Sequence, residues 1–330
     1  MKMLHLNFSL LREAEKGELA KTYFGQLLTF LGVFLVSTLL QSIIPCIYVW
    51  DDMMTAMSQA NINTADSNEI YSFYTNYSFG VGFLVLSLFC TAVGIVVTFL
   101  YCRGFERRKI SSLGFVRKNA AKSYLFGALA GFVMFAVCIC LCVLFGGGQL
   151  NVQNNINFGI ILAYLGGFIV QGMYEEVIFR GYFFVSTASV KPIGYAIIAN
   201  SVLFSLAHGL NTGVTALAFV NIALFGVFMS LCMIYTENIW FIGALHSFWN
   251  FSQGNIFGVS TSGMNMDVSV LSFSAKSGSE LLNGGAFGME GSIIVSVVLT
   301  AAIVAIAWLI KEKSARKQQE GNPENLRADA

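Results

Sequence analysis

Four polar residues in the second half of the chain have the side chains that peptide hydrolysis requires. Glu175 and His208 supply a carboxylate and an imidazole, which together can take a proton from water. His246 and Asn250 are four residues apart, so on a helix they point the same way and can donate hydrogen bonds to a developing oxyanion. We therefore predict a hydrolase site in which water is the nucleophile.

These four groups lie in apolar segments, where ionisable side chains are costly. Placing one in the hydrocarbon core of a bilayer costs about 2.5–3.5 kcal/mol, so such a residue is a functional candidate by default. The composition agrees, with 11% charged residues, 56% hydrophobic residues and a mean hydropathy of +0.68. A soluble chain carries about a quarter charged residues. The sequence therefore predicts an integral, multi-pass membrane protein.

The apolar segments predict an all-α fold, a polytopic membrane helical bundle of about eight transmembrane helices. A spanning helix needs about 20 apolar residues, and lipid admits only helices or closed barrels. The predicted spans are roughly 24–49, 79–102, 124–146, 158–188, 193–209, 214–235, 239–253 and 291–310.

The basic residues predict that both termini are cytoplasmic, because inner loops carry the excess of Lys and Arg. In that orientation only Lys276 lies outside. We expect a cytoplasmic leader at 1–23, the transmembrane bundle at 24–310 and a cytoplasmic polar tail at 311–330. The leader is too charged for a signal peptide, which together with compact loops favours a bacterial cytoplasmic membrane. The Gly- and Ser-rich outer segment 254–290 could be a lid, but its composition favours a flexible connector.

Two spacing arguments predict how the ionisable groups are arranged. A turn at Lys191-Pro192 places Glu175 and His208 at the same depth, roughly 24 Å from the turn at 1.5 Å per residue. Glu176 and Arg180 are at i and i+4, so they can pair on one helix face. Glu175 is rotated away from that face, so its side chain must face another helix, where His208 is its candidate partner.

The three motifs together resemble those of the CPBP intramembrane proteases. They are Glu-Glu-x-x-x-Arg at 175–180, Phe-x-x-x-His at 204–208 and His-x-x-x-Asn at 246–250, all within 170–252. That family includes CAAX prenyl endopeptidases and Abi-type proteins of bacteriocin processing and self-immunity. The resemblance implies an eight-helix bundle and a membrane endopeptidase. It implies four catalytic residues: Glu175 and His208, which activate water, and His246 and Asn250, which hold the oxyanion. It implies three residues of structural support: Glu176, Arg180 and Phe204.

A metal-free site is the preferred interpretation, and no cofactor is expected. Glu175, His208 and His246 would suffice in number for a catalytic zinc ion, so zinc stays open as an alternative. The His-x-x-x-His helix pair of zincins is missing, however, and the metal-free scheme uses both histidines.

The expected partners are membrane lipid and a peptide or membrane-anchored protein substrate. Nucleic acid is not expected, because 19 basic and 18 acidic residues nearly balance and no basic patch is visible. Two other functions remain as alternatives. One is a catalytically idle membrane protein that acts by binding, such as an immunity protein. The less favoured one is a proton-coupled carrier, because no internal repeat is visible.

Overall fold

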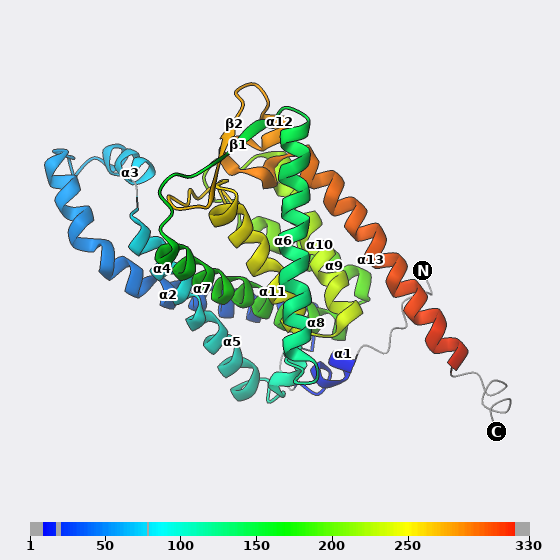
Figure 1. Ribbon diagram of the computed structural model, residues 1–330. Helices are drawn as coiled ribbons and strands as arrows, with labels where there is room; N and C mark the ends of the chain where they lie inside the picture. Colours follow the sequence, from blue (N-terminus) through cyan, green and yellow to red (C-terminus); the bar gives the residue numbers. More distant parts are fainter. Residues whose placement is uncertain (1–8, 18–20, 78, 321–330) are drawn as a thin grey trace.

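Helices dominate the computed structural model, which describes residues 9–17, 21–77 and 79–320 (Figure 1). The chain is 74% helical, which confirms the all-α prediction. Parts of the predicted leader (1–8 and 18–20) and of the predicted tail (321–330) lie outside the described residues.

The chain forms thirteen α-helices in its described part. They are α1 (Ser9–Ala14), α2 (Tyr23–Gln59), α3 (Ser67–Asn76), α4 (Val81–Cys90), α5 (Ala92–Gly104), α6 (Ala120–Leu144), α7 (Phe158–Glu176), α8 (Val185–Val190), α9 (Ile193–Ala207), α10 (Ala216–Thr236), α11 (Ile239–Phe251), α12 (Glu280–Asn283) and α13 (Ile293–Glu320). Two π-helical segments, Val177–Phe184 and Ser252–Ile256, extend α7 and α11. Strands β1 (Gly148–Val152) and β2 (Leu271–Ala275) pair antiparallel.

Six helical stretches in the described part of the chain are long and apolar enough to cross a membrane. They are Tyr23–Gln59, Val81–Gly104, Ala120–Leu144, Phe158–Val190, Ala216–Thr236 and Ile293–Arg316. The other two predicted spans correspond to α9 and α11, which have 15 and 13 residues and are shorter than a full crossing. The count of eight therefore stays a prediction, as does the cytoplasmic position of the termini.

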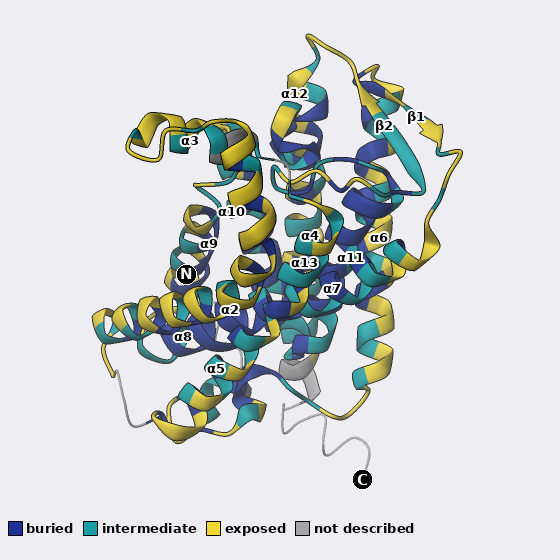
Figure 2. Cartoon of the chain, turned by 90° about the vertical axis from the view of Figure 1, so that its left-hand side faces the viewer, coloured by how far each residue is buried: buried dark blue, intermediate teal, exposed yellow. Residues whose placement is uncertain are grey.

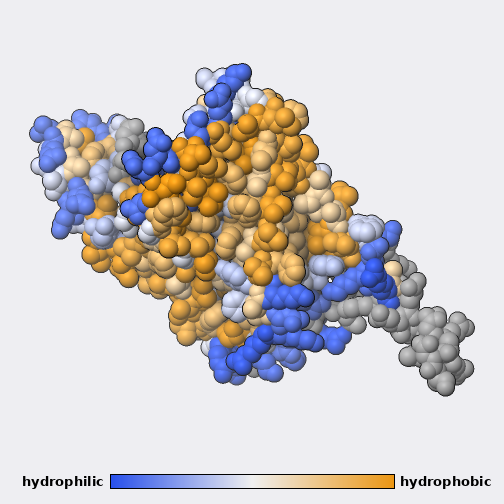
Figure 3. Space-filling view, in the orientation of Figure 1, coloured by the Kyte–Doolittle hydropathy of each residue, from blue (hydrophilic) through white to orange (hydrophobic). Residues whose placement is uncertain are grey.

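The surface of the helical bundle is that of a membrane protein. A broad apolar band separates hydrophilic regions at opposite ends of the molecule (Figure 3). Large apolar side chains of α2, such as Leu35 and Ile47, are more than half exposed. Figure 2 shows the same exposure along the outward side of α2, whereas α7 and α11 are largely buried. Burial in lipid explains this exposed apolar surface.

Small residues bring the helices that carry the motifs into close contact. Helix α11 packs against α6 and α7, and α10 packs against α9 and α13. A Cβ atom at Gly131 of α6 would lie 2.2 Å from the carbonyl oxygen of Leu245, and one at Gly172 of α7 would lie 2.6 Å from the amide nitrogen of Ser247. Only glycine permits these two approaches, so both positions fix where α11 sits.

The outer segment 254–290 is folded, so its interpretation as a flexible connector was wrong. Strand β2 pairs with β1 along its whole length, from Gly148 opposite Ala275 to Val152 opposite Leu271. The Asn283 side chain donates a hydrogen bond of 2.9 Å to the carbonyl of Gly147. This segment covers one end of the bundle, at the top of Figure 1. Its long-range contacts were invisible to a composition argument.

Candidate active site

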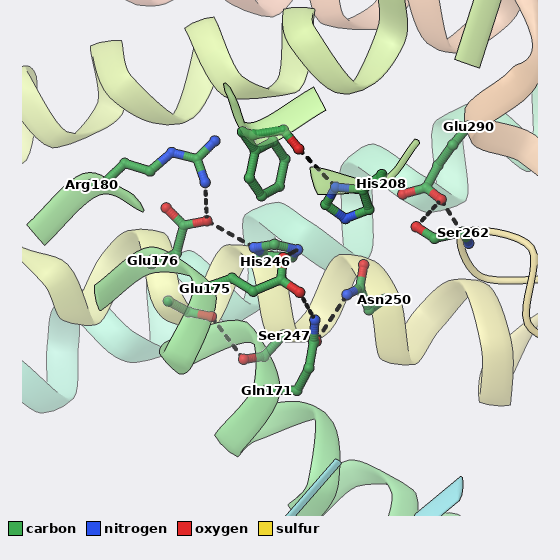
Figure 4. Close-up of polar contacts among 12 residues, drawn as sticks. Gln171, Glu175, Glu176, Arg180, His208, His246, Ser247, Asn250, Ser262 and Glu290 are labelled. Carbon is green, nitrogen blue, oxygen red and sulfur yellow. Dashed lines mark hydrogen bonds and ion pairs between the residues drawn. The ribbon is translucent and has the colours of Figure 1, made fainter. Parts of the chain in front are cut away.

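Three helices bring the predicted site residues together (Figure 4). Helix α7 carries Glu175 and Glu176 at its end, and the following π-helical segment carries Arg180. His208 caps the C-terminus of α9, and α11 carries His246 and Asn250. π-Helical turns inside α-helices occur frequently at functional sites, and this one begins directly after the two glutamates.

Glu176 and Arg180 form a fully buried ion pair. Arg180 Nη1 donates to Glu176 Oε1 at 2.9 Å, which confirms the predicted i, i+4 pairing. The guanidinium also lies 4.1 Å from the centroid of the Phe204 ring, a cation–π contact. On its other side Phe204 packs against His208, and the centroids of these two rings are 4.8 Å apart. Phe204 thus lies between Arg180 and His208. These contacts agree with structural support for all three residues.

Glu176 has a second contact that the sequence did not indicate. His246 Nδ1 lies 2.8 Å from Glu176 Oε1, and both groups are buried. An ionised carboxylate accepts hydrogen bonds only, so Nδ1 carries a proton and donates it to Glu176. The other ring nitrogen, Nε2, lies 3.6 Å from Glu175 Oε2. Glu176 therefore connects the arginine to the histidine and fixes the orientation of the imidazole ring.

The expected direct pairing of Glu175 with His208 does not occur among the contacts of the described residues. His208 Nδ1 lies 2.8 Å from the carbonyl oxygen of Phe204, so Nδ1 is the protonated nitrogen and Nε2 keeps a lone pair. The imidazole nearest to Glu175 is that of His246. The depth argument brought Glu175 and His208 to one layer, but it could not fix how each helix is rotated.

Gln171 connects two of the predicted catalytic residues. Its Nε2 donates to Glu175 Oε1 at 2.5 Å, and its Oε1 accepts from Asn250 Nδ2 at 3.1 Å. Glu175 Oε2 is buried and accepts no hydrogen bond from the described residues. Gln171 lies four residues before Glu175, on the same helix face, and belongs to none of the three motifs. Its amide holds one carboxylate oxygen and leaves the other for a proton transfer.

A cavity of about 460 Å³ joins these groups, and its size is typical of small-molecule sites. All four predicted catalytic residues line it: Glu175, His208, His246 and Asn250. Glu176 and Arg180 are fully buried and are not among the lining residues. The outer segment also contributes to the wall through Ser262 and Glu290, which sequence analysis missed. No local motif marks these two residues.

The geometry gives no support to the alternative in which Glu175, His208 and His246 bind zinc. Within the described part of the chain, no three His, Cys, Asp or Glu side chains are close enough together to hold a metal ion. Glu175, His208 and His246 line one cavity without converging on a common point, and His246 Nδ1 is engaged by Glu176. The metal-free scheme stays a prediction.

A comparison with protein families covers the part of the chain that holds this site. Residues 157–252, which are 96 of the 330 residues, match the family of type II CAAX prenyl endopeptidases described as Rce1-like. This segment is therefore similar to the CAAX proteases of the CPBP family. The matched range runs from the N-cap of α7 to the end of α11. It contains all seven predicted site residues.

The family supports a CAAX-protease-like intramembrane peptidase as the general activity. Searches of curated proteins and of solved structures give no match to the chain. The roles of individual residues and the nature of the substrate therefore have to be argued from the site itself.

Proposed function

We propose that this protein is an intramembrane endopeptidase that hydrolyses a peptide bond in a membrane-associated peptide or protein. The observation that carries the proposal is the cavity shared by Glu175, His208, His246 and Asn250, which come from three different helices of the family segment. A carboxylate, two imidazoles and a carboxamide around one apolar-walled space are the groups that water-dependent amide hydrolysis requires.

In the proposed mechanism, Glu175 takes a proton from water while the water oxygen adds to the carbonyl carbon of the scissile bond. The lone pair on His208 Nε2 makes His208 a second proton acceptor beside Glu175. The tetrahedral intermediate then collapses, the C–N bond breaks, and the amine leaves with the proton taken from water. The products are a carboxylic acid and an amine, and one water molecule is consumed.

Asn250 and His246 stabilise the oxyanion in this scheme. Asn250 has two N–H groups, of which one donates to Gln171, so the other can face the substrate. His246 donates through Nε2 only as imidazolium, because its Nδ1 proton is committed to Glu176. The carboxylates of Glu175 and Glu176, at 3.6 and 2.8 Å, favour that cationic form by direct attraction.

The test compares the new protein termini in membranes that contain wild-type protein or Glu175→Ala at equal abundance. Termini that disappear in the variant establish proteolysis and identify the substrate in the same experiment. Glu175→Gln is the conservative companion, because it keeps the size of the side chain and removes the base. Identical termini with correctly folded protein would refute the protease proposal and favour the binding or carrier alternatives.

A further inference from the structure

Charge is distributed unequally between the two ends of the bundle. One end, the basic face, is formed by the α5–α6 segment, the α8–α9 turn and the last turns of α13. Its basic residues include Arg103, Lys109, Arg117, Lys118, Lys122, Lys191, Lys311 and Arg316. The opposite end, the acidic face, consists of 51–80, 145–158, 208–215 and 254–292. Its described residues include one Lys, Lys276, and no Arg. The basic face is therefore the cytoplasmic one by the positive-inside rule.

The site residues lie toward the acidic face. Helix α9 starts at Ile193, beside Lys191 of the basic face, and has 15 residues. His208 at its C-terminus is therefore about 22 Å away from the basic face, at 1.5 Å per residue. The hydrocarbon core of a bilayer is about 30 Å thick, so the imidazole lies in the outer third.

The loops that border the cavity all belong to the acidic face. Asn211 follows His208 in the α9–α10 connection, and residues 261–266 and Glu290 belong to the folded outer segment. The lining residues include none from the basic-face connections 105–119, 191–192 and 237–238. On that side the cavity is backed by the fully buried Glu176–Arg180 pair. A substrate therefore has direct access from the acidic face or from the lipid beside it.

The charge of the cavity wall restricts what can enter. Glu175 and Glu290 are the acidic lining residues, and the lining contains no Lys or Arg. Glu290 Oε2 is held by the amide nitrogen and the hydroxyl of Ser262, at 2.9 and 2.8 Å. Beyond the His246 imidazolium assigned to the oxyanion, a free C-terminal carboxylate would meet two carboxylates here and no Lys or Arg, whereas a lysine, an arginine or an amino terminus would be attracted to Glu290.

We infer that the substrate is a neutral or basic peptide segment presented at the extracytoplasmic side of the membrane, not an acidic C-terminal tail presented in the cytoplasm. The inference rests on the proposed function, since it names the side and the class of substrate for the same site. Glu290, in the cavity wall, is the specificity residue that attracts the basic group. Ser262 and the segment around it hold that carboxylate in place.

Thiol labelling tests the inference independently of catalysis. A cysteine is introduced at Ser87, a lining residue of α4, in full-length protein in sealed membrane vesicles of known orientation. The probes are membrane-impermeant methanethiosulfonates with either a trimethylammonium or a sulfonate group. Ser277→Cys on the acidic face and Lys118→Cys on the basic face are the side markers, and the unmodified protein corrects for its seven native cysteines.

We expect Ser87→Cys to react from the side on which Ser277→Cys reacts. The ratio of the labelling rates, cationic reagent over anionic reagent, should be about tenfold higher at Ser87→Cys than at Ser277→Cys. The reason is that a cleft focuses the field of the carboxylates that line it. Adding Glu290→Gln should reduce this preference while labelling from that side continues. Reaction only from the side of Lys118→Cys, or faster reaction with the anionic reagent, would overturn the inference. Either result would leave the comparison of protein termini, and so the protease proposal, intact.

Discussion

Removal of the Gln171 amide should slow catalysis without preventing substrate binding. In Gln171→Ala, Glu175 Oε1 loses its donor at 2.5 Å and Asn250 Nδ2 loses its acceptor at 3.1 Å. A hydrogen bond to a charged group contributes about 1.5–3 kcal/mol. If that energy orients Glu175 in the transition state, kcat should fall roughly 10- to 150-fold, since about 1.4 kcal/mol corresponds to a factor of ten. KM should change little.

The assay measures kcat and KM in membranes, on the substrate that the comparison of protein termini identifies. Gln41→Ala is the matched control, because Gln41 lines the same cavity from α2 and forms no hydrogen bond with Glu175 among the described residues. Gln171→Glu is the diagnostic variant. It places a second carboxyl group beside Glu175, so like-charge repulsion should move the pH profile of kcat, which a purely structural role of Gln171 would leave in place.

Two results would refute this reasoning about Gln171. One is an unchanged kcat in Gln171→Ala, which would mean that Glu175 is oriented by other contacts. The other is an equal loss of activity in Gln41→Ala, which would show that the cavity responds to any truncated wall residue. Thermal unfolding of both variants in detergent separates either result from a general loss of folded protein.

Three further predictions concern the ion pair, the helix packing and the metal. Arg180→Met should destabilise the protein by about 3–5 kcal/mol, because it leaves Glu176 charged and buried without its partner. Adding Glu176→Gln should restore thermal stability but not activity, since His246 then loses its carboxylate partner. Gly131→Ala should lower both the midpoint of thermal unfolding and kcat, because the new Cβ atom would lie 2.2 Å from the Leu245 carbonyl oxygen. Gly32→Ala is the control and should change neither quantity, because a Cβ atom there would have no neighbour within 4 Å. Purified active protein should contain no stoichiometric zinc and should keep its activity in the presence of a chelator. One zinc ion per chain by elemental analysis, with activity lost on chelation and restored by added zinc, would instead establish a metalloprotease.

Local spacing predicted the parts of the site that lie on one helix. Glu176 and Arg180 pair because i, i+4 neighbours share a helix face whatever surrounds them. The depth argument also placed Glu175 and His208 in one layer, since both lie the same number of residues from the α8–α9 turn. Helix length and the cost of burying charge were sufficient for these two results.

Contacts between helices were beyond reach of the sequence alone. The bond between Glu176 and His246 depends on how α7 and α11 are rotated relative to one another, and the close approach at Gly172 sets that rotation. The wall around Glu290 depends on a strand pairing between residues that are more than a hundred positions apart. Composition described segment 254–290 as flexible because glycine and serine say nothing about distant partners.

The pairing of β1 with β2 also has a consequence for the order in which the enzyme matures during synthesis. β1 emerges before α7, whereas β2, Glu290 and the lining residues Val295 and Leu299 emerge only after α11. The four predicted catalytic residues are therefore in the membrane before the outer wall of their cavity has been translated. Until the first turns of α13 are inserted, the nascent protein holds the chemical groups of a protease without the enclosed space that would let them act, so activity has to wait for α13.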